Sequence, residues 1–315
     1  MTKIYATQNG NLFGYACINT QLSSLPKSQR IMTNRSMIRK TFDEKGTSYA
    51  AELALENCED LVRIIRWNEE RGIKFYRISS EVFPWASEYR IEDLPKFENI
   101  FQALQTAGRL AKQFGQRLSF HPGPFNKLVS SDEKILSNTI KDLEIHGKIF
   151  DLMGLEKSHQ YKINIHVGAA YDNKALALDT FNKNVDKLSE SVRSRLTVEN
   201  DDKESLYSTR ELYDGVFLKT AVPIVFDYHH HRFCSGGLSE EESLKLALST
   251  WGGIKPVVHY SESRCDEHND KSKPQAHSDF VYSKISDYGE HFDCMIEAKM
   301  KELAVIKYFN IHGDS

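Results

Sequence analysis

The chain has 315 residues, of which 40% are hydrophobic and 27% are charged, and it contains 17 glycines and 8 prolines. This composition is that of an ordinary globular protein and excludes the disordered, collagen-like and low-complexity classes. The 41 Lys and Arg residues against 44 Asp and Glu residues give a formal charge of −3, which argues against a protein that coats nucleic acid along its length.

The N-terminal half of the chain alternates short apolar runs with longer helical patterns. The apolar runs predict strands at 12–16, 75–78 and 118–120. Apolar positions three and four residues apart, with glycines just beyond the ends, predict helices at 49–71, 97–114 and 132–153. Residues 19–48 are polar and basic, and we expect a loop with little order there.

The C-terminal half continues this alternation. Apolar runs predict strands at 163–165, 196–198, 223–226, 257–258 and 294–296. Helical patterns predict helices at 175–192, 209–219, 239–249 and 298–309. The long polar segment 261–291 lies between the last two strands, and its length indicates an active-site loop.

Strands that alternate with helices over about 300 residues are typical of a (β/α)8 TIM barrel. We therefore expect a single domain that covers residues 1–315. A doubly wound open sheet is the alternative, but it needs a glycine-rich phosphate loop after the first strand. Gly10 and Gly14 do not form that fingerprint, so the barrel is favoured.

The sequence predicts neither a membrane span nor a secretory signal. No stretch approaches the ~20 apolar residues that a span needs, and the first residues lack a basic region followed by an apolar one. The 5 cysteines have no Cys-x-x-Cys spacing, so neither a disulfide framework nor a cysteine zinc site is expected. We expect a cytoplasmic monomer without a protein partner, associated with the nucleoid if the host is prokaryotic.

Six predicted strands are directly followed by a residue that can bind a metal ion. These residues are His121, His166, Glu199, Asp227, His259 and Glu297. In a barrel such positions converge on the C-terminal mouth, where catalytic groups meet. A single strand-end histidine is more often a core or helix-capping residue. Six such side chains together indicate a cation, because uncompensated carboxylates in one cavity would repel one another.

Two more histidines join this group by their spacing. His230 lies three residues after Asp227, where a turn can return it to the mouth, and His277 lies in the long polar loop. The adjacent His229 and His231 are expected to be bystanders. Eight nitrogen and oxygen ligands exceed the needs of one ion, so we expect two or three divalent metals. Closely spaced metals suit phosphodiester hydrolysis, because one generates hydroxide and another stabilises the leaving oxygen.

Ordered motifs run through most of the chain. They are Gly14-Tyr15 with Asn19, Thr33-Asn34-Arg35, His121-Pro122-Gly123, His166-Val167-Gly168, Glu199-Asn200-Asp201, Asp227-Tyr228-His229-His230, Val258-His259, Ala276-His277 and Glu297-Ala298-Lys299. In this order they resemble the UV damage endonuclease family, which is similar in turn to the endonuclease IV-like metal-dependent barrels. The number of ordered motifs makes the resemblance specific.

The resemblance implies a (β/α)8 barrel that nicks double-stranded DNA 5′ of UV photoproducts, namely cyclobutane pyrimidine dimers and 6-4 photoproducts. It implies hydrolysis by a metal-activated hydroxide at a manganese-type cluster, with Zn²⁺, Mg²⁺ or Co²⁺ as alternative ions. The eight residues named above are implied as its ligands and catalytic residues. Tyr15 and Asn19 are implied to lie beside the flipped lesion, where Tyr15 and Phe125 would supply stacking surface.

Two positions depart from the family pattern. After His-Pro-Gly the family commonly carries Gln-Tyr, which resembles a probe inserted opposite the lesion, and here the pair is Pro124-Phe125. Phe125 can still wedge between bases and stack on one of them. Some members carry a carboxylated lysine two residues before the seventh-strand histidine. Here that position is Val257, and Lys255 lies two residues earlier.

Basic residues offer contacts for DNA phosphates. Five cluster after the first strand and two lie near the loop histidine: Lys27, Arg30, Arg35, Arg39 and Lys40, and Lys271 and Lys273. We expect phosphate contacts there, with Arg35 among them, and a solvated loop is the alternative for each.

Two further functions stay open at this point. One is an abasic-site endonuclease or a sugar isomerase on the same metal-dependent barrel, and the other is a non-catalytic protein that binds lesions. Phe125 and the basic segment favour DNA over a sugar. The full set of ligands favours catalysis over binding alone.

Overall fold

Eight parallel strands form the centre of the molecule, and the computed structural model describes residues 5–7 and 9–313. The strands are β1 (Phe13–Ala16), β2 (Phe75–Arg77), β3 (Arg117–Ser119), β4 (Ile163–Ile165), β5 (Leu196–Glu199), β6 (Ile224–Asp227), β7 (Val257–Tyr260) and β8 (Asp293–Ile296). They are paired in the order β3-β2-β1-β8-β7-β6-β5-β4.

The two ends of this order meet just beyond β3. Phe120 forms a parallel bridge with Ile163. Its N–H donates to the Lys162 carbonyl at 2.9 Å, and its carbonyl accepts from the Asn164 N–H at 3.0 Å. The sheet therefore closes, which confirms the predicted (β/α)8 barrel.

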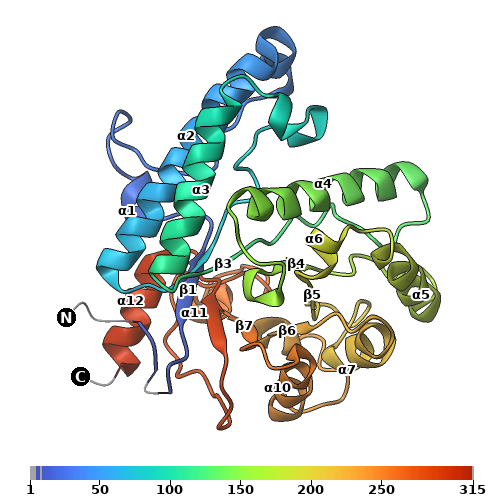
Figure 1. Cartoon of the computed structure of the whole chain (residues 1–315). Helices are drawn as coiled ribbons and strands as arrows, with labels where there is room; N and C mark the ends of the chain where they lie inside the picture. Colours follow the sequence, from blue (N-terminus) through green and yellow to red (C-terminus); the bar gives the residue numbers. More distant parts are fainter. Residues whose placement is uncertain (1–4, 8, 314–315) are drawn as a thin grey trace.

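Helices cover the outside of the barrel (Figure 1). The longer ones are α2 (Arg39–Arg71), α3 (Phe97–Gln113), α4 (Glu133–Leu152), α5 (Lys174–Val185), α10 (Glu240–Leu248) and α12 (Lys301–His312). The short ones are α1 (Thr20–Ser23), α6 (Glu190–Arg193), α7 (Thr209–Leu212), α8 (Leu218–Thr220), α9 (Tyr228–His231) and α11 (Arg264–His268). Among the described residues, no helix has both the length and the apolar character that a membrane crossing requires.

Single helical turns complete the connections. Turns of 3-10 helix lie at Ala86–Glu88, Ile91–Asp93, His159–Tyr161 and Ser249–Trp251. A π-helical turn, Tyr213–Phe217, joins α7 to α8.

Two segments differ from the sequence-based expectation. The segment 19–48 was expected to be a loop, but α1 lies within it and α2 already begins at Arg39. The first turns of α2 bury little apolar surface apart from Phe42, so no periodic pattern marked them, and a kink at Gly46, where φ is 62°, interrupts the helix. The helix expected at 175–192 is divided into α5 and α6.

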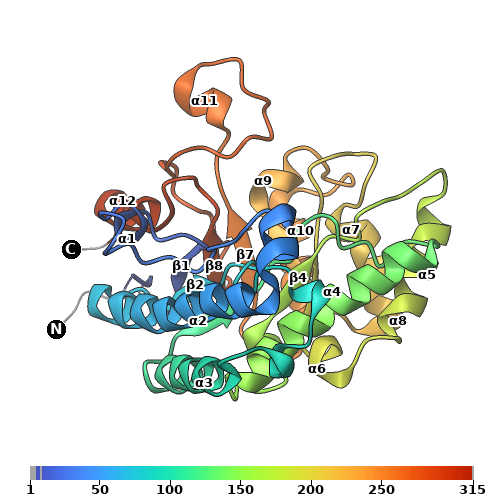
Figure 2. The ribbon, with the colours of Figure 1, turned by 90° about the horizontal axis from the view of Figure 1, so that it is seen from above.

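The long loop 261–291 is partly ordered by its own contacts. It carries α11, and Ser263 pairs with His277 in an antiparallel bridge. Figure 2 shows α11 standing clear of the barrel above β7 and β8.

The barrel interior is divided into layers that explain where the site lies. An apolar cluster fills the middle and includes Phe75, Val225 and Met295. Arg117, at the start of β3, is fully buried and bonds Asp293, at the start of β8, at 3.0 Å. Because parallel strands all end at the same rim, polar side chains above the apolar layer collect at the C-terminal mouth.

Candidate metal centre

The structure brings all six predicted strand-end residues to the mouth of the barrel: His121, His166, Glu199, Asp227, His259 and Glu297. Glu199 and Asp227 end β5 and β6, and His259 lies within β7. None of these three has exposed surface. Side chains alternate along a strand, so each of these strands directs its last inward residue to the same cavity.

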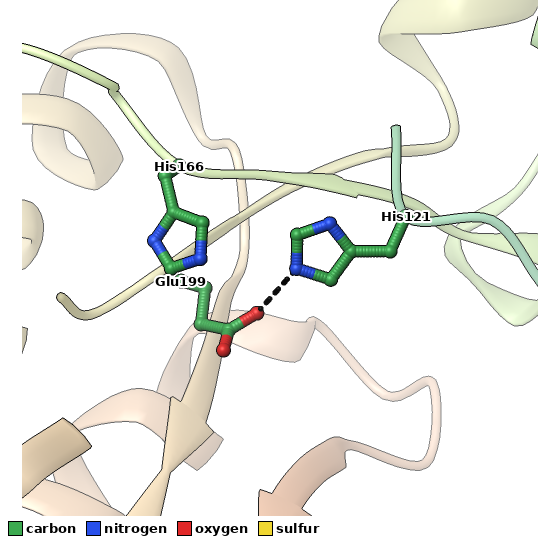
Figure 3. Close-up of side chains that lie close together, drawn as sticks. All are labelled: His121, His166 and Glu199. Carbon is green, nitrogen blue, oxygen red and sulfur yellow. Dashed lines mark hydrogen bonds and ion pairs between the residues drawn. The ribbon is translucent and has the colours of Figure 1, made fainter. Parts of the chain in front are cut away.

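Three overlapping groups of side chains offer ligand atoms that lie within 4.8 Å of one another. The groups are His121 with His166 and Glu199, Glu199 with Asp227 and His230, and Asp227 with His259 and Glu297. Figure 3 shows the first group, in which His121 Nε2 lies 3.1 Å from Glu199 Oε2. Glu199 and Asp227 each belong to two groups, as carboxylates do when they bridge neighbouring ions. The arrangement therefore offers up to three neighbouring ion positions.

Buried atoms without hydrogen-bond partners show that these residues fit a metal cluster. The atoms are His166 Nδ1, Glu199 Oε1, Asp227 Oδ2 and His259 Nδ1. His259 Nδ1 lies 3.0 Å from a Glu199 oxygen and 3.1 Å from a Glu297 oxygen, yet out of line for a hydrogen bond. Each buried polar atom left unpaired costs about 1–3 kcal/mol. Divalent cations would satisfy all four, and mixed imidazole and carboxylate donors suit ions such as Zn²⁺ and Mn²⁺.

His230 and His277, which were predicted as ligands from their positions in the sequence, lie at the edge of this cluster. Asp227 caps α9 by accepting the His230 N–H at 2.8 Å, and that turn returns the ring to 3.3 Å from Glu199 Oε1. His277 lies farther out, with Nε2 at 4.0 Å from Glu297 Oε2. Its Nδ1 lies 2.6 Å from the Ser261 hydroxyl, which fixes the ring. His277 thus lies beside the three groups and is not a member of any of them.

Burial and neighbouring charge move the pKa values of the cluster in opposite directions. Burial by itself lowers the pKa of His166, but the carboxylates of Glu199, Asp201 and Asp227 outweigh it and raise that pKa to about 9. Burial raises the pKa of Asp227 to about 7, despite the attraction of His230. Burial also lowers the pKa of His259 to about 4. Such divergent shifts arise where titratable groups are crowded in a water-poor site.

Three residues that the sequence did not single out support the ligands. Asp201 Oδ1 lies at an ion-pair distance of 3.0 Å from His166 Nδ1, although the two atoms are not aligned for a hydrogen bond. Asn164 donates to Glu199, and Arg77 forms an ion pair with Glu297. A polar residue inside an apolar strand was the available signal for Asn164, and a charged residue at the end of β2 was the signal for Arg77. Such supporting contacts fix ligand orientation and ligand charge.

A buried lysine approaches the cluster from a strand that was not expected to provide one. Lys162, just before β4, places Nζ 3.2 Å from His259 Nε2. Its burial, together with the nearby Arg77 and Arg117, lowers its pKa to about 7. Lys255 lies at the opposite end of the barrel, where it bonds Asp293 at 2.7 Å. Lys255 therefore does not take the place of the lysine that some family members carry at the position of Val257.

Tyr15 and Asn19 lie elsewhere than the resemblance implied. The Tyr15 ring has no exposed surface and packs between β1 and α2, where its hydroxyl donates to Asn68 at 2.9 Å. Asn19 is 1% exposed, bonds the Tyr15 hydroxyl and caps α1. The Tyr15 ring faces the helical layer and offers no face to a base. It is therefore not placed to stack on a lesion, contrary to the expectation. Both residues anchor the β1–α1 turn.

Arg35 is also engaged within the protein. Its guanidinium lies 2.6 Å from the buried Asp60 and 3.1 Å from Glu56, and it donates to two carbonyls of its own segment. Arg39 pairs with Asp43 at 2.8 Å and with Glu88 at 3.1 Å. The charge of Arg35 thus holds the segment before α2 against that helix, and its expected phosphate contact stays a prediction.

The mouth continues outward into a cavity that the ligands share with two loops. The cavity has a volume of about 590 Å³, and its lining includes His166, His230 and His277 together with residues 122–124, 126 and 127. Phe125, in that loop, is 87% exposed. The ring thus projects from a loop that lines the cavity, and its contact with DNA stays a prediction.

Comparison with known proteins relates this geometry to one family. A family model described as UV-endonuclease UvdE matches residues 11–313. A UV-damage endonuclease from Schizosaccharomyces pombe is 34% identical over 303 residues, which are 93% of this chain and 49% of that protein. The chain therefore spans about half the length of this relative.

Two further matches cover most of both chains. A UV DNA damage endonuclease from Bacillus cereus (strain Q1) is 34% identical over 272 residues, with 82% of this chain and 81% of that protein covered. The crystal structure of SacUVDE superposes with a TM-score of 0.81 at 27% identity, covering 96% of this chain and 97% of that one. Similarity to this family therefore extends through the whole barrel.

Proposed function

The chain belongs to the UV-endonuclease UvdE family, and from that premise we propose that it is a DNA repair endonuclease that nicks UV-damaged double-stranded DNA. We propose that the nick lies 5′ of the lesion and that cyclobutane pyrimidine dimers and 6-4 photoproducts are both substrates. The observation that carries the proposal is the set of buried, unpartnered ligand atoms at the mouth of the barrel. Those atoms occur in a chain that is similar throughout to proteins named for this activity.

Two or three divalent ions, with Mn²⁺ favoured, are proposed to occupy the mouth. The proposed ligands are His121, His166, Glu199, Asp227, His230, His259, His277 and Glu297. When bound, such ions supply Lewis acidity to a phosphodiester and neutralise the charge that develops on it.

The protein's own side chains are proposed to orient this cluster. Asn164 holds Glu199 by a hydrogen bond, and Asn164 in turn accepts from Thr197 at 2.7 Å. Ser261 holds His277, and Arg77 balances the charge of Glu297. These contacts leave the ligands little rotational freedom, so a phosphodiester would meet a site that needs no rearrangement.

Phe125 is the proposed contact to the damaged region of the DNA. Adjacent damaged bases must leave the helical stack before the backbone can enter the mouth, and weakened pairing at a lesion lowers that cost. An exposed ring on the rim of the cavity can fill the gap that the displaced bases leave. Selectivity for damage would then arise from the lower cost of unstacking.

Nicking of supercoiled plasmid tests this proposal and separates it from the alternatives. We expect the protein with Mn²⁺ to relax UV-irradiated plasmid, to leave unirradiated plasmid intact, and to lose activity in EDTA. Nicking of abasic plasmid alone would favour an abasic-site endonuclease, and conversion of an aldose to a ketose would favour a sugar isomerase. Binding to irradiated DNA without nicking, with metal present, would identify a non-catalytic lesion-binding protein.

A further inference from the structure

Two loops flank the cavity outside the metal-type cluster, and their backbones touch. One lies between β3 and α4 and carries Phe125, and the other lies between β4 and α5. At Gly168, where φ is 95°, a Cβ would lie 3.2 Å from the Lys127 side chain and 3.5 Å from the Asn126 carbonyl. Residues close to this contact on either loop therefore belong to one rim.

Tyr171 lies on the second loop, three residues after Gly168. Its side chain is 63% exposed, and its φ is 47°. A left-handed conformation is unfavourable for a bulky residue, and such strain is often found where function requires it. Isolated exposed apolar residues are common on protein surfaces. Tyr171 differs from them because it combines exposure and strain with a place on the β4–α5 loop, which begins at the candidate ligand His166.

A buried side chain bonds the backbone of each loop. The buried Tyr207 donates its hydroxyl to the Ala169 carbonyl at 2.9 Å, two residues before Tyr171. On the other loop, the buried Asn184 donates to the Leu128 carbonyl at 2.7 Å. The Tyr171 ring therefore projects from a fixed backbone, which reduces the entropy that binding would cost.

We propose that Tyr171 is a second aromatic contact to damaged DNA, which stacks on a nucleobase displaced from the helix next to the lesion. This inference rests on the proposed function and adds a specificity-determining residue to it. An intact duplex covers the faces of its bases, so a ring gains a stacking partner only where a base has left the stack. Lys127 and Lys203 line the same cavity, and their charges suit the phosphates beside such a base.

The test compares Tyr171→Ala with the wild type on duplex oligonucleotides. For a duplex with one photoproduct, kcat/KM should fall about 5- to 100-fold, mainly through KM, because stacking contributes roughly that much per base. Affinity for the undamaged duplex, measured by fluorescence polarisation, should change less than about twofold, because no base face is available there. Tyr171→Phe should retain the wild-type values.

Two controls separate loss of contact from loss of fold. Tyr171→Gly should lose activity like the alanine variant while its Tm stays at or above that of the wild type, because glycine relieves the left-handed strain. Tyr288 is a matched tyrosine with φ of 50° that bonds Glu240 and lies outside the two loops described above. Tyr288→Ala should leave kcat/KM unchanged.

The outcomes also distinguish this inference from the proposed function. If the wild type does not nick irradiated DNA, the proposed function fails. If the wild type nicks it and Tyr171→Ala nicks it equally well, the proposed function stands and the role of Tyr171 is refuted. An equal loss of affinity on damaged and undamaged duplex would also refute the stacking contact.

Discussion

Glu199 connects two of the three ligand groups at the barrel mouth, and its carboxylate is surrounded by the rings of His121, His166 and His259. We therefore expect Glu199→Gln to be more damaging than its small change in volume suggests. Nicking of irradiated plasmid should fall at least about 100-fold, and elemental analysis should find less bound metal. His268→Ala, an exposed histidine outside this cluster, is the control. Full activity and full metal content in the glutamine variant would remove Glu199 from the centre.

Our second prediction is that metal binding releases protons. The raised pKa of His166, about 9, keeps this ring charged at pH 7, and the raised pKa of Asp227, about 7, keeps that carboxyl half protonated. Metal ligation requires the deprotonated forms, so binding must release protons and its affinity must rise from pH 6 towards pH 9. Titration calorimetry of Mn²⁺ into the metal-free protein, in two buffers of different ionisation enthalpy, measures this release. Identical heats in both buffers would contradict it.

Phe125 provides a third prediction at this scale. The ring is 87% exposed, so Phe125→Ala should leave the Tm and the bound metal unchanged. The rate of nicking on irradiated DNA should fall about 5- to 100-fold if the ring stacks on a base. Phe125→Tyr, which keeps a ring, should keep most of the activity. An alanine variant with the wild-type rate would show that the rim contacts DNA elsewhere.

Charged side chains of the protein itself hold the segment between α1 and α2 in place. From the sequence alone, the basic residues of this segment would be assigned to contacts with a ligand. Arg35 bonds the buried Asp60, and the Arg35 N–H donates to Asn57 on the same helix at 3.0 Å. The basic character of this stretch thus belongs in part to the packing of α2. Contacts of this kind are made across more than twenty residues of chain.

Arg35→Ala tests that assignment. It should lower the free energy of unfolding by about 2 kcal/mol, which is less than breaking a fully buried pair costs, because Asp60 keeps Arg63 and the Met32 N–H. The Tm should therefore fall, while the salt dependence of DNA binding should change little. Lys27→Ala, at an exposed position of the same segment, is the control for the Tm. A reduced salt slope with an unchanged Tm would restore Arg35 as a phosphate contact.

At the scale of the whole molecule, the barrel gathers buried titratable side chains at its mouth. Arg117, at the start of β3, is paired with Asp293, whereas four buried ligand atoms at the mouth have no hydrogen-bond partner. The strands therefore meet around a cluster that is unfavourable until cations compensate it. Such a site couples the stability of the barrel to the ions that it binds.

Removal of metal should consequently destabilise the whole barrel. Binding to the native state alone stabilises it by about 2.7 kcal/mol when the free ion is at one hundred times its Kd. We expect EDTA to lower the Tm of the purified protein and added Mn²⁺ to restore it. Glu199→Gln should show a smaller difference between the two conditions. A Tm that does not respond to either treatment would argue against a metal-linked fold.

The fold and most of the candidate ligands were predictable because their signals are local. An apolar run that ends in His166 or Asp227 defines both a strand and its C-terminal residue, and strand ends in a parallel barrel share one rim. The barrel architecture then brings those residues together, independently of the conformation of the connecting loops. Phe125 was singled out by the family resemblance, and the barrel places its loop, between β3 and α4, at that rim.

What the sequence by itself determined was therefore the order of the elements and the rim at which their last residues meet. The tertiary structure alone decided which way Tyr15 faces, which acids neutralise Arg35, and that Lys162 approaches His259. Those features depend on contacts between residues far apart in the chain, and neither periodicity nor motif spacing encodes such partners. Burial then sets the charge of each group, because it is the folded surroundings that remove water from a side chain.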